Sequence, residues 1–344
     1  MAYTTVNKSS DYFNNKLYTG NGSTQTISGV GHQPDLVWVK QRNGAAYHQL
    51  TDVLRGVNSQ SASNDTGLGA SNACVTAFNS DGFALGSNGD VNGNTLTYAS
   101  WNWKANGTGS ANTAGSINST VSVNTTSRFS IVKWAGSGSL ATIGHGLGVV
   151  PKMIICKSVD TGGWGIYHEA TGNGRGLFLN IDGVGGTDVA YWNNTSPTSS
   201  VFTVNFDGGT NREGGSDMIA YCFADVQGFS KFGSYIGNGN ADGTFVYTGF
   251  KPALVIFKKT SGTGGWNMFD TKRDPFNVQD QILRANATNA EASDSGYSDN
   301  DFLSNGFKLR QTWGEMNGSG ATYIYMAFAE APFVGTNNVP ANAR

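Results

Sequence analysis

The chain has 344 residues, enough for two or three domains with cores of their own. Lys and Arg number 22 against 24 Asp and Glu, so the net charge of −2 excludes a strongly basic nucleic-acid-binding protein. Only 13% of residues are charged, whereas Gly occurs 48 times and aromatic residues make up 12%, which excludes coiled coils and disordered chains. This composition is typical of short strands joined by tight turns.

Export, membrane insertion and disulfides are not expected. No stretch reaches the roughly 18 apolar residues of a membrane helix, and the first residues lack a secretory signal. Cys74, Cys156 and Cys222 are an odd number of widely spaced cysteines without metal-ligand spacing, so we predict that they are core residues. The sequence gives no reason to expect a metal ion or another cofactor.

The first predicted unit covers residues 1–104 and includes an N-terminal segment. Its run from Pro34 to Lys40 is apolar without alternation, which predicts a central strand covered on both faces. The unit closes on the aromatic run 98–103. Residues 105–126 follow, a Gly-, Ser-, Thr- and Asn-rich segment that predicts a flexible linker, although its second half alternates Ser or Thr with Val as a strand does. We therefore expect the first unit to be more independent than the other two.

Two further units repeat the landmarks of the first. The second unit, 127–227, has its Pro-to-Lys run at 151–157, and the third, 228–334, has it at 252–258. Each unit has the turn-separated β-branched and aromatic runs of an antiparallel sandwich. We predict an all-β protein of three tandem, jelly-roll-like β-sandwich units related by internal repetition, followed by a C-terminal tail at 335–344. The one candidate helix is 277–292.

The sequence contains no nucleophile motif, and we predict no catalytic residue. His48 and His168 each follow a tyrosine at matching places, where the third unit has Asp270, which indicates a polar position at a strand end. The repeated lysines at the ends of the apolar runs are expected to cover the core with their stems and to keep their ammonium groups in water. These lysines are Lys40, Lys157 and Lys258.

Tryptophans in predicted loops are the candidate ligand-binding residues. Aromatic side chains in loops rich in Asn, Ser and Gly provide flat contact surfaces beside adaptable hydrogen-bonding groups. An exposed indole can stack on a sugar ring. The candidates are Trp164, Trp192, Trp266 and Trp313.

The opening residues 1–22, the repeated Pro-to-Lys blocks and the ending 325–333 together resemble uncharacterised virion proteins of tailed bacteriophages. Those most similar come from marine phages, including phages of cyanobacteria, and are usually described as tail-fibre-like or structural. The resemblance spans nearly the whole chain. That family has no established catalytic residues to transfer to this sequence.

The resemblance implies a non-enzymatic structural protein exposed on the virion, as a tail fibre or tail appendage that contributes to host-cell adhesion. Its expected partners are other virion proteins, further copies of itself with a trimer favoured, and a host surface glycan. The alternatives are a capsid decoration protein and a carbohydrate-binding lectin. A glycan depolymerase is a further alternative and would need two carboxyl groups facing each other at about 5–10 Å.

Overall fold

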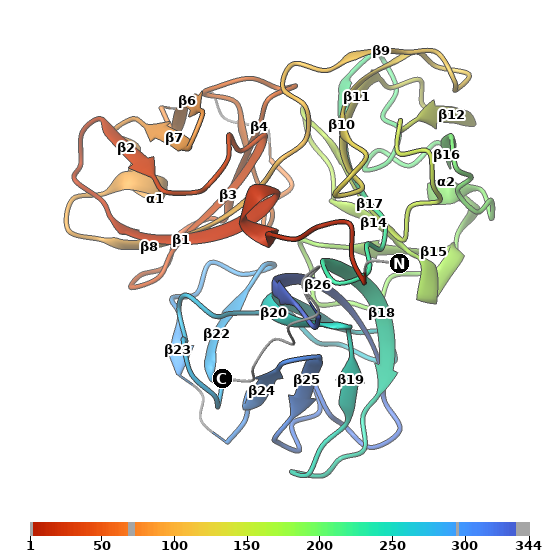
Figure 1. Ribbon diagram of the computed structural model, residues 1–344. Helices are drawn as coiled ribbons and strands as arrows, with labels where there is room; N and C mark the ends of the chain where they lie inside the picture. The colour runs from red at the N-terminus through yellow and green to blue at the C-terminus, as the bar shows by residue number, and fades with distance from the viewer. Residues whose placement is uncertain (1–2, 68–72, 294–295, 335–344) are drawn as a thin grey trace.

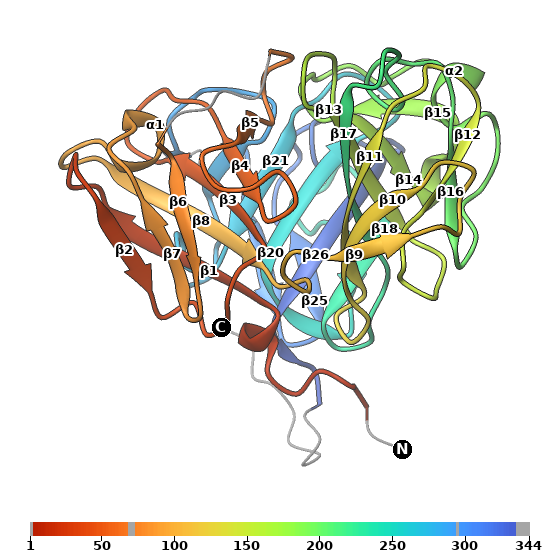
Figure 2. The same ribbon diagram turned by 90° about the horizontal axis from the view of Figure 1, so that it is seen from above.

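The computed structural model describes residues 3–67, 73–293 and 296–334, and it confirms the all-β class, with 44% of residues in strands and 4% in helices. The sheets are antiparallel and fall into three successive parts of the chain, here called thirds (Figures 1 and 2). The predicted C-terminal tail, 335–344, lies outside the described residues.

The first third forms a five-stranded and a three-stranded sheet. Its elements are η1 (Ser9–Asp11), β1 (Phe13–Thr19), β2 (Gln25–Ser28), β3 (Leu36–Gln41), β4 (Gln49–Asp52), β5 (Gln60–Ala62), β6 (Val75–Asn79), β7 (Gly82–Leu85), α1 (Gly89–Asn92) and β8 (Thr97–Trp103). The larger sheet has the order β1-β8-β3-β4-β5, and the smaller has the order β2-β7-β6.

The middle third forms a seven-stranded and a two-stranded sheet. Its elements are β9 (Ser110–Asn112), β10 (Ser119–Asn124), β11 (Phe129–Ala135), β12 (Ala141–Gly144), β13 (Met153–Ser158), β14 (Gly165–His168), η2 (Glu169–Thr171), β15 (Gly172–Phe178), α2 (Val189–Trp192), β16 (Val201–Val204) and β17 (Asp217–Phe223). The larger sheet has the order β9-β10-β11-β17-β13-β14-β15, and β12 pairs with β16.

The last third forms a six-stranded and a three-stranded sheet. Its elements are β18 (Ser230–Ile236), β19 (Phe245–Tyr247), β20 (Phe250–Lys259), β21 (Trp266–Asp270), β22 (Gln281–Arg284), β23 (Ala292–Ser293), β24 (Asn300–Leu303), β25 (Gly306–Leu309) and β26 (Thr322–Pro332). The larger sheet has the order β18-β26-β20-β21-β22-β23, and the smaller has the order β19-β25-β24.

Five strands keep one order in all three large sheets: β1-β8-β3-β4-β5, β11-β17-β13-β14-β15 and β18-β26-β20-β21-β22. In each third the small sheet packs on the large one over its own hydrophobic cluster. The runs that follow the three prolines are central strands, as predicted, and every residue of β3 and β13 is buried. In β3, Val37 and Val39 face the sandwich interior, whereas Leu36 and Trp38 face the middle of the molecule.

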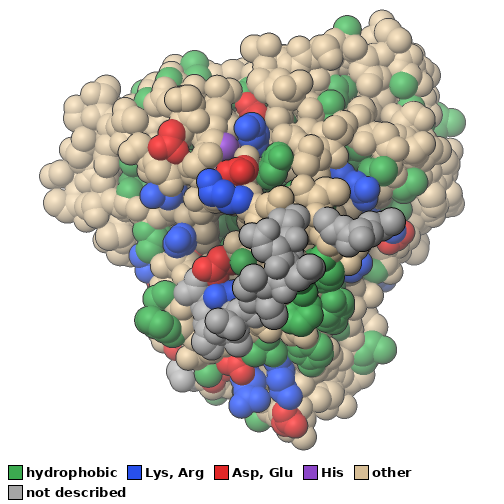
Figure 3. Space-filling view, in the orientation of Figure 1, with side chains coloured by type: hydrophobic (Ala, Val, Ile, Leu, Met, Phe, Trp, Pro, Cys, Tyr) green, Lys and Arg blue, Asp and Glu red, His purple; other side chains and the backbone are tan. Residues whose placement is uncertain are grey.

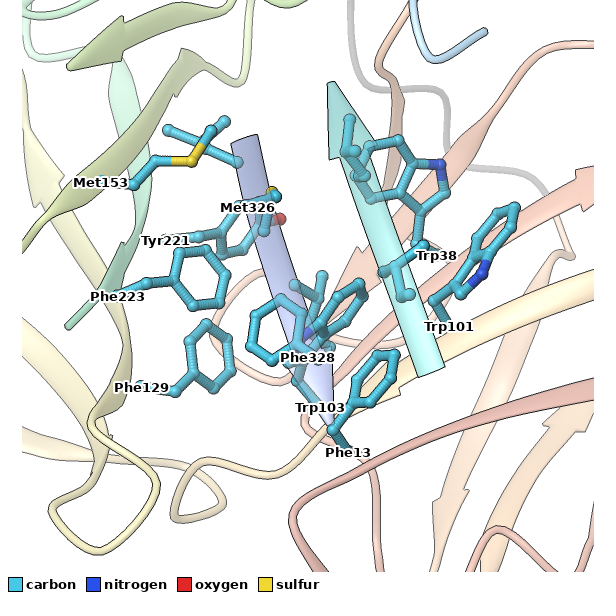
Figure 4. Close-up of a cluster of buried hydrophobic side chains, with 14 of the residues drawn as sticks. Phe13, Trp38, Trp101, Trp103, Phe129, Met153, Tyr221, Phe223, Met326 and Phe328 are labelled. Atoms are coloured by element: carbon cyan, nitrogen blue, oxygen red, sulfur yellow. The ribbon is translucent and has the colours of Figure 1, made fainter. Parts of the chain in front are cut away.

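One hydrophobic core joins the three large sheets in the middle of the molecule. Trp103, Phe223 and Phe328, each from a different third, lie at its centre (Figure 4). Their ring centroids are 6.4 Å apart for Trp103 and Phe223, 5.5 Å for Trp103 and Phe328, and 5.8 Å for Phe223 and Phe328. The first third is therefore not the independent unit that we predicted, because its tryptophans form part of the shared core.

The segment predicted as a linker belongs to the middle sheet. Residues 110–112 and 119–124 form β9 and β10, and β10 pairs along the edge of β11. Val121 is buried in the middle third, and the Ser122 hydroxyl accepts a hydrogen bond from the Asn106 amide (2.8 Å). The alternation in the second half of this segment thus predicted a strand correctly, whereas the flexible linker was wrong.

Two other expectations are tested by the structure. The candidate helix 277–292 is absent, since Ile282 and Leu283 point to opposite faces of β22 and enter two different hydrophobic clusters. The N-terminal segment contacts the first third, as predicted, because the Ser10 carbonyl lies 2.8 Å from His32 Nδ1, but it also packs on the last third. The Tyr3 hydroxyl donates to the Gly249 carbonyl (2.8 Å), and its ring lies 6.4 Å from that of Phe333.

The repeated lysines bury their ammonium groups rather than keeping them in water, because loop carbonyls replace the water. The Lys40 amine donates to the Gln41 carbonyl (2.6 Å), and the Lys157 amine donates to the Gly162 carbonyl (2.7 Å). The Lys258 amine donates to the Gly264 and Asp182 carbonyls, both at 2.7 Å. Asp182 belongs to the middle third, so Lys258 joins the middle third to the last third.

These lysines make stability depend on pH above about 8. Burial lowers the pKa of Lys40, Lys157 and Lys258 to about 8, below the ordinary value of 10.5 that applies to the unfolded chain. Below pH 8 the cost of burying the charges is fully present. Above pH 8 the unfolded chain binds more protons than the folded chain, so the free energy of unfolding rises with pH. This rise in the free energy of unfolding ends near pH 9. Burial raises the pKa of the cysteine thiols, that of Cys74 to about 12, so above pH 9 the thiols ionise in the unfolded chain first and favour unfolding.

We therefore expect the urea midpoint to be higher at about pH 8.8 than at about pH 7.5. The variant Lys258→Met, which removes one of the three titrating groups, should show a smaller increase over the same interval. Equal midpoints for the natural protein at the two pH values would contradict the pKa shifts.

Candidate binding pocket

Three of the four candidate tryptophans are buried and cannot stack on a ligand. Trp164, Trp192 and Trp266 are at most 2% exposed. The Trp164 indole donates to the Ala62 carbonyl (2.7 Å), and the Trp266 indole donates to the Phe178 carbonyl (2.8 Å), in both cases across a boundary between thirds. The prediction that these three residues bind ligand is wrong, because Trp164 and Trp266 close the core where two thirds meet and Trp192 lies in the hydrophobic cluster inside the middle third.

The fourth candidate, Trp313, is half-buried in the last third. The Arg284 guanidinium lies 5.5 Å from its ring centroid, a cation–π distance. The guanidinium therefore occupies one face of this indole.

The histidine alignment is also corrected by the strand register. In each large sheet one residue lies opposite the residue two positions after the repeated proline. These equivalent residues are Asp52, His168 and Asp270. His48 instead corresponds to Trp164, and its Nδ1 atom accepts a hydrogen bond from the Trp38 indole (3.0 Å). Burial lowers the pKa of His48 well below its ordinary value, and the neutral ring serves packing.

The described part of the chain contains neither a metal-binding cluster nor a membrane-spanning helix. In residues 3–67, 73–293 and 296–334 no three His, Cys, Asp or Glu side chains gather as a metal site would require. Over the same ranges none of the helices has the length and apolar character to cross a bilayer.

A pocket of about 420 Å³ brings together aromatic, cationic and hydrogen-bonding side chains from four segments of the chain. We call it the tyrosine pocket. Figure 3 shows hydrophobic side chains gathered on this face of the molecule, over the region of β18 and β19, with charged side chains nearby. The pocket is lined by Tyr3, Arg128, Asp225, Gln227, Ser230, Lys231, Tyr247, Thr248 and Gly249.

Two tyrosines form one wall of the tyrosine pocket. Their hydroxyl oxygens are 3.1 Å apart, and the Tyr3 hydroxyl also reaches the Gly249 carbonyl. Tyr247 is 55% exposed, because the alternation of β19 places Val246 in the core and Tyr247 outside. Burial and the neighbouring phenol raise the pKa of Tyr3 to about 12, so this hydroxyl stays protonated at neutral pH.

The rest of the pocket lining carries an excess of positive charge. The Lys231 amine lies 2.6 Å from one Asp225 carboxylate oxygen, and the other accepts a hydrogen bond from the Phe232 amide (2.9 Å). Arg128 donates one N–H to the Asp225 main-chain carbonyl (2.8 Å). Among the described residues no Asp or Glu carboxylate oxygen forms an ion pair with the Arg128 guanidinium within 4.0 Å. Because Lys231 offsets Asp225, Arg128 leaves the pocket with one uncompensated positive charge.

Two larger hollows lie at boundaries between thirds, and their charged groups already have partners. A hollow of about 480 Å³ between the first and middle thirds contains the ion pair of Lys133 and Asp217 (2.8 Å). A hollow of about 560 Å³ between the middle and last thirds contains Arg175, which donates to the Thr260 carbonyl (3.0 Å). The tyrosine pocket is therefore the better candidate for binding an external ligand.

The fold and this pocket define an all-β protein whose three thirds share one core. The chain belongs to the family described as "Domain of unknown function (DUF7483)", whose model matches residues 8–332 as one unit. Neither the curated proteins nor the solved structures include a match to this chain.

The residues of the tyrosine pocket were not identified from the sequence. Arg128 is the last residue of the turn 125–128, and Tyr247 lies in the three-residue strand β19. The alternation Phe245-Val246-Tyr247 was the one local signal, since it places two aromatic rings on the same face. Nothing in the sequence indicates that this face meets Tyr3 and Arg128.

Proposed function

We propose that the protein is a non-enzymatic component of a bacteriophage particle, exposed on its surface in a tail fibre or tail appendage, where it contributes to adhesion to the host cell. The phage setting rests on the resemblance of residues 1–22 and 325–333 and of the Pro-to-Lys blocks to virion proteins. The binding role rests on one observation, the tyrosine pocket with its exposed phenol and uncompensated guanidinium.

The architecture supports a binding role because it holds the pocket rigidly. Tyr3, Arg128 and Tyr247 come from segments that the shared core fixes relative to one another. Cys74, Cys156 and Cys222 are free and buried, so stability depends on packing and is independent of the redox state in which the protein is made or used. In the particle we expect contacts with other virion proteins and a homo-oligomer, with a trimer favoured.

The test combines location with adhesion. Cryo-electron microscopy of the phage particle should show the protein at the tail, and the purified full chain should bind host cells and compete with phage adsorption. Density over the capsid lattice would assign a decoration role instead. Saturable glycan binding by a protein absent from particles would indicate a lectin, and release of reducing ends from host polysaccharide would indicate a depolymerase.

A further inference from the structure

We propose that the tyrosine pocket binds a carboxylate-bearing sugar unit of an acidic surface polysaccharide. This inference deepens the proposed adhesion function by naming the chemical class of the ligand. It rests on the charge of the pocket, on the side chains offered to a sugar ring and on the backbone conformation of Arg128.

The charge favours an anionic ligand. The ion pair with Lys231 and the hydrogen bond from the Phe232 amide occupy both oxygens of Asp225, so this carboxylate is not available to attract a cation. Arg128 uses one N–H on a main-chain carbonyl, and a guanidinium has five such donors in a planar fork. That fork matches the two oxygens of a carboxylate, and such charge-assisted bidentate pairs are among the strong hydrogen bonds in proteins.

The remaining side chains suit a sugar ring. Tyr247 exposes the apolar face of its ring together with a hydroxyl, and Gln227 is exposed at the pocket rim with both donor and acceptor atoms. The volume of about 420 Å³ lies in the range of small-ligand sites, roughly 300–1,000 Å³. A carboxylated hexose offers a ring to stack, hydroxyls to bond and one charge for Arg128.

The backbone supports a role for the Arg128 side chain beyond packing. Arg128 has φ of +52°, a left-handed conformation that glycine adopts without strain and that other residues rarely adopt. Tyr12 comes directly before β1 as Arg128 comes directly before β11, so the two positions are equivalent. The φ angle of Tyr12 is −132°, so the left-handed conformation is not common to this position. An arginine at a position whose backbone suits glycine is explained if its guanidinium is needed there.

The same feature provides a variant that should fold. Arg128→Gly removes the guanidinium and relieves the left-handed strain, so we expect its thermal midpoint to stay close to that of the natural protein. Tyr247→Ala removes the stacking surface of the pocket. The matched control is Tyr297→Ala, because Tyr297 is similarly exposed, at 60%, and is not among the residues that line the pocket.

The experiment is calorimetric titration of the full chain with digalacturonate and with sialyllactose, at low and physiological salt. We expect at least one acidic sugar to bind, and we expect its neutral counterpart, methyl-esterified digalacturonate or lactose, to bind about tenfold more weakly or not at all. Arg128→Gly should weaken binding by about tenfold or more, and Tyr247→Ala by several-fold, whereas Tyr297→Ala should bind as the natural protein does.

Three outcomes would overturn the inference: no binding of either acidic sugar, equal binding of the neutral counterparts, or binding that Arg128→Gly leaves unchanged. Displacement of the sugar by inorganic phosphate at equal concentration would show a general anion site and would equally overturn it. The proposed adhesion function is separable from these results. If the natural protein and Arg128→Gly bind host cells equally tightly, the adhesion function stands and this ligand is ruled out. If the natural protein fails to bind host cells, the adhesion function itself is contradicted.

Discussion

Replacing Phe328 with alanine is expected to lower the free energy of unfolding by about 3–5 kcal/mol, the usual cost of deleting a buried phenylalanine ring. Phe328 is 1% exposed and lies at the centre of the shared core. Its ring contacts five others, with centroid distances from 4.9 to 6.1 Å, so the cavity would be lined by aromatic rings that cannot collapse into it without moving their strands. These rings belong to Phe13, Trp103, Phe223, Phe229 and Phe232.

Because these rings come from all three thirds, the variant should still unfold in a single transition at lower denaturant concentration. Tryptophan fluorescence and far-ultraviolet circular dichroism should give the same midpoint during urea unfolding. The matched control is Phe206→Ala, whose ring is 59% exposed and whose loss should change stability by about 0.5 kcal/mol or less. Two separate transitions, with only the last third lost first, would show that the thirds are independent domains.

The sequence predicted the sheets better than it predicted how they meet. The runs after Pro34, Pro151 and Pro252 were correctly predicted as central strands, because a strand covered on both faces needs apolar side chains at successive positions. That pattern does not say what covers each face. In β3 one face meets the small sheet of its own third and the other meets the distant residues of the shared core. The hydrophobic period and the composition of a strand are the same whichever element covers its faces. The sequence therefore could not distinguish a shared core from three separate ones.

The candidate site was predicted less well, for a related reason. Trp164 and Trp266 lie in stretches rich in glycine that look like exposed loops, but each indole finds a carbonyl acceptor in the preceding third. Burial of an indole depends on such a partner, and the partner is about 90–100 residues away in the chain. Arg128 and Tyr247 were missed because the pocket is assembled from segments that are adjacent only in the folded molecule.

A second large effect is expected at the boundary between the first and middle thirds, where Arg55→Ala should cost about 3–5 kcal/mol. The Arg55 and Asp52 side chains are buried as an ion pair with an Nε–Oδ2 distance of 2.5 Å. The Tyr221 hydroxyl, from the middle third, lies 2.9 Å from both the Asp52 carboxylate and the Arg55 guanidinium. Burial, together with the Asp52 carboxylate, raises the pKa of Tyr221 well above 10 although Arg55 acts in the opposite direction, so the phenol remains a donor. Without Arg55 the Asp52 charge stays buried and is no longer offset, which is the main part of the cost.

The protein itself provides the control for this prediction. At the boundary between the middle and last thirds, the register places His168, Thr171 and Met326 where Asp52, Arg55 and Tyr221 lie. Burial lowers the pKa of His168 to about 4, so a neutral ring stands at this position in place of the buried Asp52–Arg55 ion pair.

Transferring this neutral set by Asp52→His, Arg55→Thr and Tyr221→Met removes both charges together. The triple variant should therefore be more stable than Arg55→Ala alone by at least about 1 kcal/mol in urea unfolding, although it changes three residues instead of one. If the triple variant is less stable than Arg55→Ala, the intact ion pair stabilises the fold by more than the cost of leaving the Asp52 charge unpaired. That outcome would also mean that the two boundaries, despite their equivalent strands, are stabilised by different interactions.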